Sequence, residues 1–430
     1  MKYLLLLIFI SLLSLSLQIS ITQPTERSGN FIATQMCFGT PAECMSGALN
    51  FGSCKSFVAD STMRPDLNNQ YRVGNSKTFS LIRPEPIDYT YESFSKKING
   101  LQVSDVLTIS KYKLGQINFY HASQSEEFNK LDGVLGICYN DVDGNFSALD
   151  LLQPHKVVSF QANTVTFGKL PDFAVVNYKQ YGNCAVNELS EKWQCSAKGF
   201  ILSNSYVEEG VESLDNKMIT FDYGIEKSYV PLSFLLYLEH VYFKELIKAN
   251  ECTFGFKGDH YAFSCMKNSY SLKPISFIFG DWMFMINSEN MFTLDEAEGD
   301  YEFRLIAYDD KNEFIFGRNI LKYFTMVFDK TNKQVGFYSG DSVIYIGKGD
   351  PQPPKTYEDP DTPITPTPEG GEKGNLLGKF FKAVGILMLI GVAIIIAFFI
   401  FRYIRRRRFP DQSYYYKATD DLFESGTTVA

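Results

Sequence analysis

The chain has 430 residues, of which 45% are hydrophobic and 15% aromatic, and its formal net charge at pH 7 is −8. This apolar content is ample for one large domain or for two lobes, each with its own core. The acidic balance, with five arginines grouped in residues 402–408, excludes the basic folded face of a nucleic-acid-binding protein, so we expect no nucleic-acid partner.

The N-terminus has the pattern of a secretory signal peptide. Lys2 provides a positive start, and residues 3–17 form an uncharged apolar run. Small residues such as Ser16 and Ser20 offer cleavage positions, so we assign residues 1–20 to the signal peptide. The alternative, an N-terminal membrane anchor, is less favoured because the run is short for a membrane span.

Three segments of the first half combine a glycine turn with strand-like residues. Residues 38–41 read Phe-Gly-Thr-Pro, residues 50–53 read Asn-Phe-Gly-Ser, and residues 131–136 read Leu-Asp-Gly-Val-Leu-Gly. In a polar, turn-like stretch, Asn145 begins an Asn-Phe-Ser glycosylation signal, which predicts a surface position in a secreted protein.

The second half continues in strand-like runs with few helices. Residues 276–279 and 282–286 are rich in aromatic and aliphatic side chains, and the Gly280-Asp281 pair between them predicts a hairpin. The clearest helical periodicity lies in residues 232–249. A chain of many strands and sparse helices is typical of an all-β domain.

Further glycine-containing and aromatic segments complete an ordered series. Residues 192–194 read Lys-Trp-Gln, and residues 221–224 read Phe-Asp-Tyr-Gly. Residues 314–319 (Phe-Ile-Phe-Gly-Arg-Asn), 323–330 (Tyr-Phe-Thr-Met-Val-Phe-Asp-Lys) and 333–337 (Lys-Gln-Val-Gly-Phe) follow near the end of the folded part. With the earlier segments, in order and spacing, this series resembles the pepsin-like family of aspartic peptidases (peptidase A1).

The resemblance implies an all-β, bilobal pepsin-like fold with a cleft between two lobes. We expect residues 23–192 to form the N-terminal lobe and residues 193–347 the C-terminal lobe. Residues 134–136 and 315–317 both read apolar-apolar-Gly, and in the family each such segment runs beside a catalytic loop. The glycine allows the close backbone approach that this arrangement requires.

The family's chemistry uses two aspartates that share one proton and act as base and acid toward a water molecule. The resemblance places Asp222 at the second of these positions and Asn50 at the first. A carboxamide neither accepts nor releases a proton at working pH. We therefore interpret Asp222 as the retained catalytic residue and Asn50 as a degenerate position.

Neighbouring residues depart from the family pattern as well. The threonines that cross-link the two loops in the family are replaced by Phe51 and Tyr223, and a hydroxyl residue is replaced by Ile225. Ser53 is kept, and we expect it to donate a hydrogen bond to position 50. Gly52 and Gly224 are expected to support the two turns.

Two other residues are alternatives for the first carboxyl: Asp60 and a deamidated Asn50. Asp60 follows an apolar pair and precedes a serine, but a threonine replaces the glycine and the spacing from the preceding turn is too long. Deamidation of Asn50 is hindered by the bulky Phe51 that follows it.

Tyr91 is the candidate for the tyrosine of the family's β-hairpin lid, with an ordinary edge-strand aromatic as an equal alternative.

All eight cysteines precede residue 266, and an even number in a secreted chain indicates disulfides rather than a metal site. Cys184 with Cys195 and Cys252 with Cys265 are the expected local pairs. The other four lie in the first half, and their pairing stays open, with the last expected to join one of the first three: Cys37, Cys44, Cys54 and Cys138.

The C-terminal part predicts a membrane-tethered topology. Residues 348–374 contain seven prolines among polar residues and read as an extended stalk. Residues 383–401 are uncharged and apolar, long enough for a transmembrane helix. The arginines that begin the tail at residues 402–430 place that tail in the cytoplasm and the rest outside.

These observations lead to one principal hypothesis and two rivals. The principal one is a single-pass type I membrane protein of the secretory pathway that is catalytically impaired. Its monomeric ectodomain, at the cell surface or in an endolysosomal or vacuolar membrane, would bind extended polypeptide or a partner protein in the cleft. The rivals are an active membrane-anchored aspartic endopeptidase working at acidic pH and a structural or adhesion ectodomain. No cofactor and no metal are expected.

Overall fold

The computed structural model describes residues 21–353 except 25, 29–30, 60–70, 92–95, 126–131, 143, 145, 162, 267–271, 297 and 309–311. The chain separates into two compact units, Met1–Asp361 and Thr362–Ala430, and everything described below belongs to the first. The predicted signal peptide, transmembrane helix and tail lie outside the described residues, as do Asp60, Asn145 and most of the stalk.

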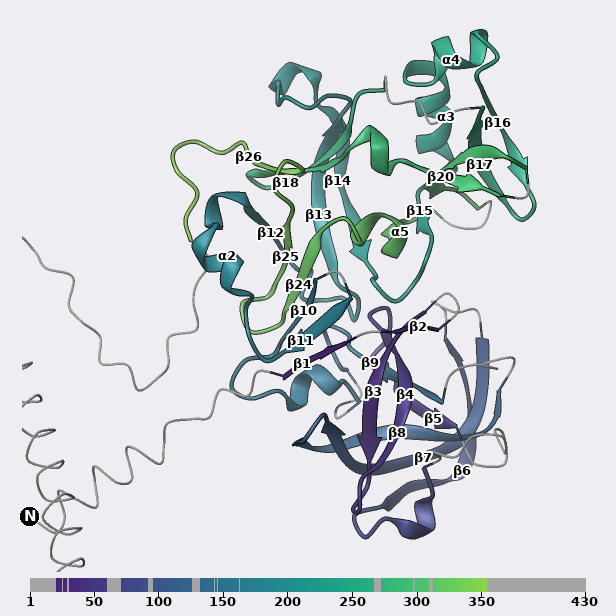
Figure 1. The fold of residues 1–430 in the computed structure, drawn as a ribbon, viewed down its shortest axis with the longest axis vertical. Helices are drawn as coiled ribbons and strands as arrows, with labels where there is room; N and C mark the ends of the chain where they lie inside the picture. The colour runs from purple at the N-terminus through teal and green to yellow at the C-terminus, as the bar shows by residue number, and fades with distance from the viewer. Residues whose placement is uncertain are drawn as a thin grey trace, which may run out of the picture. The chain divides into compact units, whose positions relative to one another are not determined.

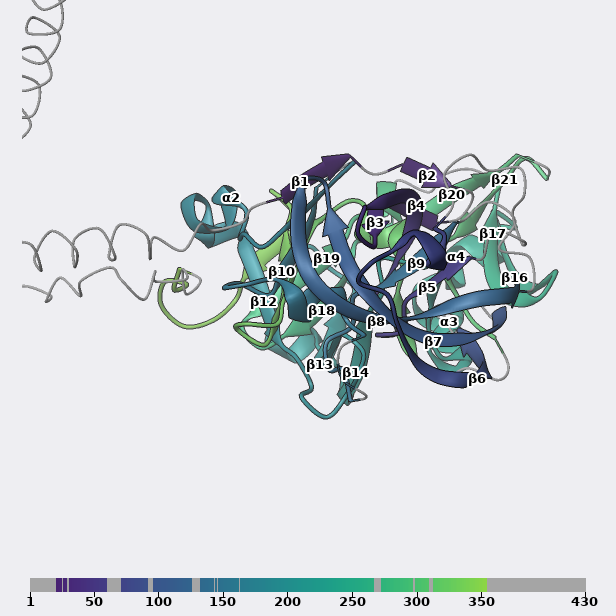
Figure 2. The same ribbon diagram turned by 90° about the horizontal axis from the view of Figure 1, so that it is seen from below.

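Among the described residues, the first half of the chain builds an eight-stranded sheet. Its spatial order is β2 (Glu26–Ser28), β3 (Phe31–Phe38), β4 (Glu43–Asn50), β9 (Gly133–Gly136), β5 (Phe57–Ala59), β8 (Tyr112–Ser125), β7 (Lys96–Ile109) and β6 (Ser80–Tyr91). β3 also pairs with β7, so this sheet curls back on itself. Figure 2 shows the long strands β6, β7 and β8 side by side.

The second half builds a second eight-stranded sheet and a separate four-stranded one, again within the described residues. The larger has the order β22 (Leu305–Ile306), β15 (Ser228–Tyr229), β23 (Phe314–Phe316), β14 (Glu212–Phe221), β13 (Gln194–Ile201), β18 (Ile275–Phe279), β19 (Trp282–Ile286) and β26 (Val343–Tyr345). The smaller has the order β16 (Cys252–Lys257), β17 (His260–Cys265), β21 (Asp300–Phe303) and β20 (Phe292–Asp295).

A six-stranded sheet joins the two halves of the chain. Its order is β1 (Ile21–Pro24), β11 (Thr164–Phe167), β10 (Val157–Gln161), β24 (Thr325–Asp329), β25 (Gln334–Tyr338) and β12 (Tyr181–Ala185). Figure 1 shows β1, β11, β10 and β24 lying together in this sheet. Since β10 pairs with β24 across the largest sequence gap, neither half completes this sheet alone.

Helices are short in the described residues. The α-helices are α2 (Asp172–Val176), α3 (Leu232–Val241), α4 (Lys244–Lys248) and α5 (Arg318–Leu321). Short 3₁₀ turns are η1 (Val73–Asn75), η3 (Ala148–Leu151), η4 (Tyr178–Gln180), η5 (Glu208–Gly210) and η6 (Ser288–Asn290). The single helix expected over residues 232–249 is divided at Tyr242 and Phe243, where the buried Phe243 ring stacks on Phe263 with centroids 4.0 Å apart.

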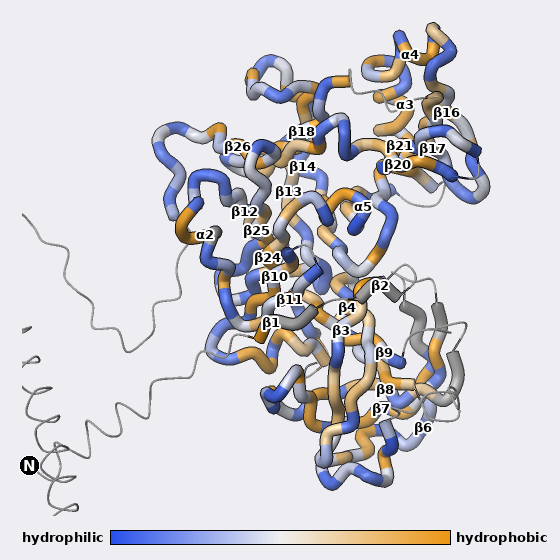
Figure 3. Tube along the Cα trace, viewed as in Figure 1, coloured by the Kyte–Doolittle hydropathy of each residue, from blue (hydrophilic) through white to orange (hydrophobic). Residues whose placement is uncertain are grey.

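The predicted all-β architecture is confirmed, as is the hairpin between β18 and β19, which turns at Gly280 with φ +55°. Every residue of these two strands is buried, which matches their continuous apolar sequence. One core cluster draws side chains from both halves of the chain. Figure 3 shows hydrophobic residues alternating with hydrophilic ones along many of the strands.

The two eight-stranded sheets share one internal arrangement. In the first, the neighbouring strands β4, β9, β5 and β8 run in that order, and in the second β14, β23, β15 and β22 correspond to them. β4 is parallel to β9 and β14 to β23, whereas β5 and β15 run antiparallel to those partners. In each half, β4 or β14 therefore ends beside a parallel strand, β9 or β23, that has an antiparallel strand on its other side.

Candidate functional site

Asn50 ends β4 and forms the first of the two predicted turns. Its side chain Oδ1 accepts a hydrogen bond from the backbone N–H of Gly52 at 3.0 Å, and its backbone oxygen accepts one from Ile137 at 2.7 Å. The residue is 0% exposed. Its Nδ2 group is buried and makes no hydrogen bond within the described structure.

Asp222 follows β14 and forms the second turn. Its Oδ1 accepts the backbone N–H of Gly224 at 2.9 Å, and its own backbone N–H donates to the oxygen of Phe316 at 3.0 Å. The residue is 3% exposed. The two turns are therefore built by the same side-chain-to-backbone hydrogen bond, with a carboxamide in one and a carboxylate in the other.

Two buried serines, which sequence reasoning missed, hold the strand that runs beside each turn. Ser56 Oγ accepts the N–H of Gly136 at 2.9 Å, and Ser228 Oγ accepts the N–H of Gly317 at 2.8 Å. Each serine lies six residues after its turn residue, and that repeated interval was the available signal. Both glycines approach backbone closely: a Cβ on Gly136 would lie 2.0 Å from Cys54 O.

The two turns lie against each other. A Cβ added to Gly224 would lie 2.6 Å from the backbone oxygen of Leu49 and 3.4 Å from the Cα of Asn50. Gly224 therefore has the backbone of the first turn as its direct neighbour. The turns that contain Asn50 and Asp222 therefore pack against each other at Gly224, and the roles expected of the two residues stay predictions.

Aromatic rings pack where the family has hydroxyl side chains. Phe160 of β10 stacks on Tyr223 with ring centroids 4.6 Å apart and contacts Phe51 at 5.2 Å. Phe51 also packs on Phe328 of β24, at 4.4 Å. Burial raises the pKa of Tyr223 to about 12, so its phenol stays neutral. Phe160 thus links the residues that follow Asn50 and Asp222, a link that no local sequence pattern indicated.

For Ser53 and Tyr91 the structure gives one hydrogen bond and one strand pairing, respectively. Ser53 is buried, and its Oγ accepts a hydrogen bond from the backbone N–H of Lys55 at 3.1 Å. Its expected donation to position 50 stays a prediction. Tyr91 is the last residue of β6 and pairs with Lys96 of β7, so it stands at the end of a hairpin whose tip lies outside the described residues.

Four disulfides join cysteines in the described structure, and the two expected local pairs, Cys184–Cys195 and Cys252–Cys265, are confirmed. The pairs left open are now assigned as Cys37–Cys44 and Cys54–Cys138.

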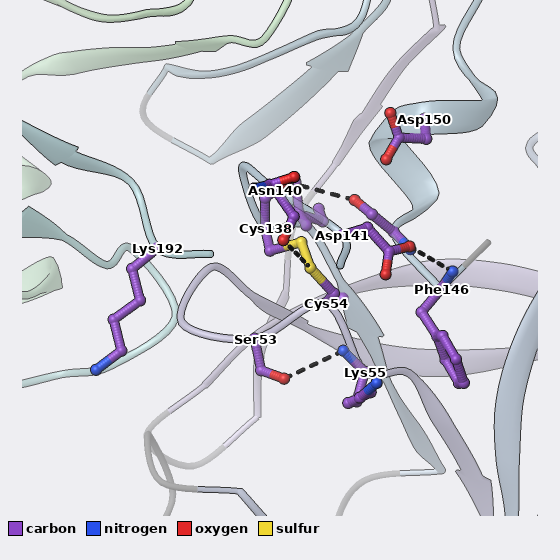
Figure 4. Close-up of a disulfide and its surroundings, with 12 residues drawn as sticks. Ser53, Cys54, Lys55, Cys138, Asn140, Asp141, Phe146, Asp150 and Lys192 are labelled. Atoms are coloured by element: carbon purple, nitrogen blue, oxygen red, sulfur yellow. Dashed lines mark hydrogen bonds between the residues drawn. A yellow bond between two sulfur atoms is a disulfide. The ribbon is translucent and has the colours of Figure 1, made fainter. Parts of the chain in front are cut away.

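The Cys54–Cys138 bond ties the segment after Asn50 to the segment after β9, and Figure 4 shows it with Ser53 and Lys55. The disulfides indicate an oxidising compartment, as for a secretory or extracellular domain.

A group of polar side chains lies in the second half of the chain, and Asp222 acts on one of them electrostatically. The charge of Asp222 contributes to the raised pKa of Tyr229, for which burial is the largest cause. The rings of Tyr229 and Tyr308 lie 5.4 Å apart, and the Tyr308 hydroxyl donates to Asp259 at 3.3 Å. Asp259 in turn contacts buried His260, with Oδ1 and Nδ1 2.7 Å apart.

A cluster of carboxylates surrounds Lys257 on the four-stranded sheet. Its Nζ lies 3.0 Å from both Asp295 and Glu298 and 3.2 Å from Asp300. Burial opposes the charge of the ammonium, but these three acceptors together raise the pKa of Lys257. The carboxylates of Asp295, Glu298 and Asp300 are close enough together to hold a cation, but the ammonium of Lys257 already offsets their negative charge.

No helix in the described part of the chain is long and apolar enough to cross a membrane. The predicted span at 383–401 lies outside that part.

The sequence profile of the eukaryotic aspartyl protease family matches residues 32–339. No curated protein sequence matches significantly. Among solved structures, the chain is similar to the aspartic proteinase from Irpex lacteus, with a TM-score of 0.58 and 17% sequence identity over 75% of this chain and 100% of that chain. This likeness shows a pepsin-like fold. Since the family match covers most of its length, the chain belongs to the eukaryotic aspartyl proteases.

Proposed function

We propose that this protein is a catalytically impaired aspartyl protease that binds extended polypeptide, or a segment of a partner protein, without hydrolysing it efficiently. The observation that carries the proposal is the carboxamide of Asn50 in the turn that packs against Gly224, two residues after Asp222. General acid–base catalysis by a positioned group contributes about 10² to 10⁴ in rate, and groups that act as a pair lose more when one is removed.

The retained scaffold supports binding. Both turns keep the same hydrogen bond, and Gly136 and Gly317 keep their close approach to neighbouring backbone. An extended peptide binds a strand edge through main-chain hydrogen bonds that need no catalytic group. β6 and β7 form a hairpin whose edge strand ends at Tyr91, and we propose that this hairpin takes the place of the family's lid.

The decisive experiment measures cleavage of a mixed peptide library by the full-length chain between about pH 3 and pH 7, with and without pepstatin. We expect no pepstatin-sensitive cleavage above that of the Asp222→Ala variant. Cleavage that requires Asp222 would overturn the proposal and favour the active endopeptidase. Absence of both cleavage and peptide binding would favour a structural or adhesion role.

An Asn50→Asp variant tests the cause of the impairment. The substitution supplies the missing carboxyl in a turn whose backbone already donates to that side chain, so we expect acid-dependent cleavage to rise by about 10² or more. Asn187→Asp is the matched control, because Asn187 Oδ1 also accepts a backbone N–H two residues on, from Leu189 at 3.2 Å. The control should leave cleavage unchanged.

We further propose that residues 383–401 anchor the domain in a membrane, with the disulfide-bonded part on the luminal or extracellular side. The disulfides support an oxidising compartment, and the arginines after residue 401 support a cytoplasmic tail. Protease digestion of sealed microsomes should remove the tail epitope and spare the domain. Release of the whole protein by carbonate washing would contradict anchoring.

A further inference from the structure

β16 forms one edge of the four-stranded sheet. Among the described residues it pairs with β17 alone, and Figure 1 shows it on the far side of its sheet from β20. A strand at a sheet edge leaves alternate backbone N–H and C=O groups without strand partners. Proteins usually protect such an edge from other strands with proline, charged side chains or bulges.

The backbone groups of Phe256 face this edge. Phe256 lies opposite Tyr261 of β17, but Tyr261 exchanges its backbone hydrogen bonds with Ala307, at 2.8 and 3.0 Å. Tyr261 therefore turns its N–H and C=O away from β16, and its pair with Phe256 is of the non-hydrogen-bonded kind. The N–H and C=O of Phe256 consequently point away from β17 and out of the sheet.

Phe254 has the same orientation, because backbone direction repeats every two residues along a strand. Cys252, a further two residues back, opposes Cys265 with Cα atoms 4.0 Å apart, the short spacing of a non-hydrogen-bonded pair. Neither phenylalanine makes another backbone hydrogen bond among the described residues. Both therefore offer an N–H donor and a C=O acceptor at the edge.

β16 lacks the protection that the long edge strand β6 has. β6 contains Pro84 and Pro86, and its register with β7 shifts twice. β16 contains no proline, and its register with β17 is unbroken. Its charged residue, Lys257, directs its ammonium to the carboxylates of Asp295 and Asp300, at 3.0 and 3.2 Å. In the described structure this edge is thus open to another strand.

The side chains of β16 also suit an external partner. Phe256 is 61% exposed although it is a large apolar residue. Gly255 weakens the strand because it has no side chain to pack, and nothing in the described structure lies within 4 Å of the position of its Cβ. No neighbour within the chain therefore accounts for the glycine. A glycine inside a strand often marks the close approach of another backbone.

The sequence of β16 favours a second copy of this chain as the partner. Residues 254–256 read Phe-Gly-Phe, which is the same in both directions. An antiparallel pair of these strands centred on Gly255 places Phe254 of each copy opposite Phe256 of the other, so that their free N–H and C=O groups meet. Residues 252–256 carry no charge, so this pairing opposes no like charges, and the strand offers a charged peptide no counter-charge.

We propose that β16 pairs antiparallel with β16 of a second copy of this chain, centred on Gly255, so that two four-stranded sheets join into one. The phenylalanine rings of both copies then lie on one face of the joined sheet, where they form cross-strand pairs. The sequence favours a monomeric ectodomain, so this pairing is a departure that the sheet topology indicates. It involves neither turn of the candidate site and goes beyond the proposed function.

Sedimentation equilibrium of the full-length chain in a mild detergent tests the dimer. We expect the wild type to associate reversibly to twice the mass of one chain. Phe256→Lys places a charge at the edge, opposite an apolar ring, and should raise the dissociation constant about tenfold or more. Leu189→Lys is the matched control, because Leu189 is 94% exposed and lies outside the described strands. It should leave the dissociation constant unchanged.

Engineered cysteines test the register. Gly255→Cys brings the two new thiols opposite each other at the centre of the paired strands, as Cys252 and Cys265 oppose each other within one chain. We expect a disulfide-linked dimer on non-reducing gels. Thr253→Cys is the control on the same strand, because the centred pairing places its two new thiols about 13 Å apart, four residues along a strand. It should run as a single chain.

A wild type that stays monomeric at every concentration would overturn the inference, even where cross-linking shows that β16 holds a strand of a different protein. Equal linkage of Gly255→Cys and Thr253→Cys would also overturn it, because random encounter would explain both. The wild-type mass remains a test even if a cysteine variant does not fold. None of these outcomes bears on peptide cleavage or peptide binding, so the proposed function stands or falls separately.

Discussion

Asn50 and Asp222 begin turns that use the same side-chain-to-backbone hydrogen bond. Each side-chain oxygen accepts a backbone N–H two residues on, at 3.0 and 2.9 Å, so each turn is stable without any proton shared between them. The replacement of a carboxyl by an amide therefore costs the local structure little, because the backbone needs only an acceptor. It removes the acid–base chemistry, because catalysis needs a group that titrates.

His260 predicts a pH-dependent contribution to stability. It lies 2.7 Å from Asp259 and 3.5 Å from Glu302; the interaction with Glu302 is the largest cause that raises the pKa of His260, burial opposes it, and Asp259 adds to it. A raised folded-state pKa stabilises the fold below the unfolded value near 6.5 and loses this contribution as the pH rises through the folded value.

We expect His260→Gln to lower the melting temperature more at about pH 5.5 than at about pH 8.5, measured by differential scanning fluorimetry. The acidic end is kept at this value because the pKa values of Asp259 and Glu302 are lowered by the same histidine, so their own contribution is lost only in stronger acid. An equal loss at both pH values would show that His260 acts by packing alone.

Gly224 is predicted to tolerate no side chain. A methyl group there would lie 2.6 Å from the backbone oxygen of Leu49, which cannot move without displacing the first turn. We expect Gly224→Ala to lower the free energy of unfolding by about 1–3 kcal/mol, measured by urea titration. Gly74→Ala is the control, since nothing lies within 4 Å of its Cβ position, and it should change stability little.

At the level of elements, β10 and β24 of the six-stranded sheet place aromatic rings beneath both turns. Phe160 of β10 contacts Phe51 and Tyr223, and Phe328 of β24 packs on Phe51. The family's hydroxyl cross-link is directional, whereas stacked rings hold the turns through buried area and ring geometry. Strands β10 and β24 thus help to position the two turns.

Phe160→Leu tests this role of the sheet. The smaller side chain leaves space between Phe51 and Tyr223, so we expect peptide affinity to fall about tenfold or more, measured by calorimetry. Phe263→Leu is the matched control: Phe263 is equally buried and stacks on Phe243, but it lies in the four-stranded sheet. Both variants should lose stability. Equal loss of affinity in both would show that the effect is not local to the turns.

At the level of the whole molecule, the halves share a sheet and a core. β24 and β25 come from the second half and pair with β10 and β12 of the first half in one sheet, and one apolar cluster includes residues from both halves. The boundary predicted between residues 192 and 193 stays a prediction. The strands on either side of it are nevertheless not structurally independent.

This sharing predicts one cooperative unfolding transition for the two halves. We expect differential scanning calorimetry of the full-length chain to show a single peak for residues 21–353, with equal calorimetric and van't Hoff enthalpies for that peak. Two resolved transitions in this region would mean that the six-stranded sheet does not couple the halves.

The sequence was sufficient for the all-β class, the β18–β19 hairpin and two of the four disulfides in the described residues. These follow from periodicity, from cysteine spacing and from glycine turns, which are local properties, and from the resemblance of a series of motifs to a known family. The helix over residues 232–249 was placed correctly as helical, but its break at Phe243 depends on a stacking partner from β17.

Tertiary structure alone decided the pairing of Cys54 with Cys138, the serines that hold each turn and the position of Phe160 between Phe51 and Tyr223. Each of these joins residues far apart in the chain, and local propensity carries no information about such partners. The tertiary structure also shows that Asn50 Oδ1 accepts a hydrogen bond within its own turn, whereas the buried Nδ2 makes none in the described residues. The sequence could name that residue, but only the fold determines which of its hydrogen bonds are already made.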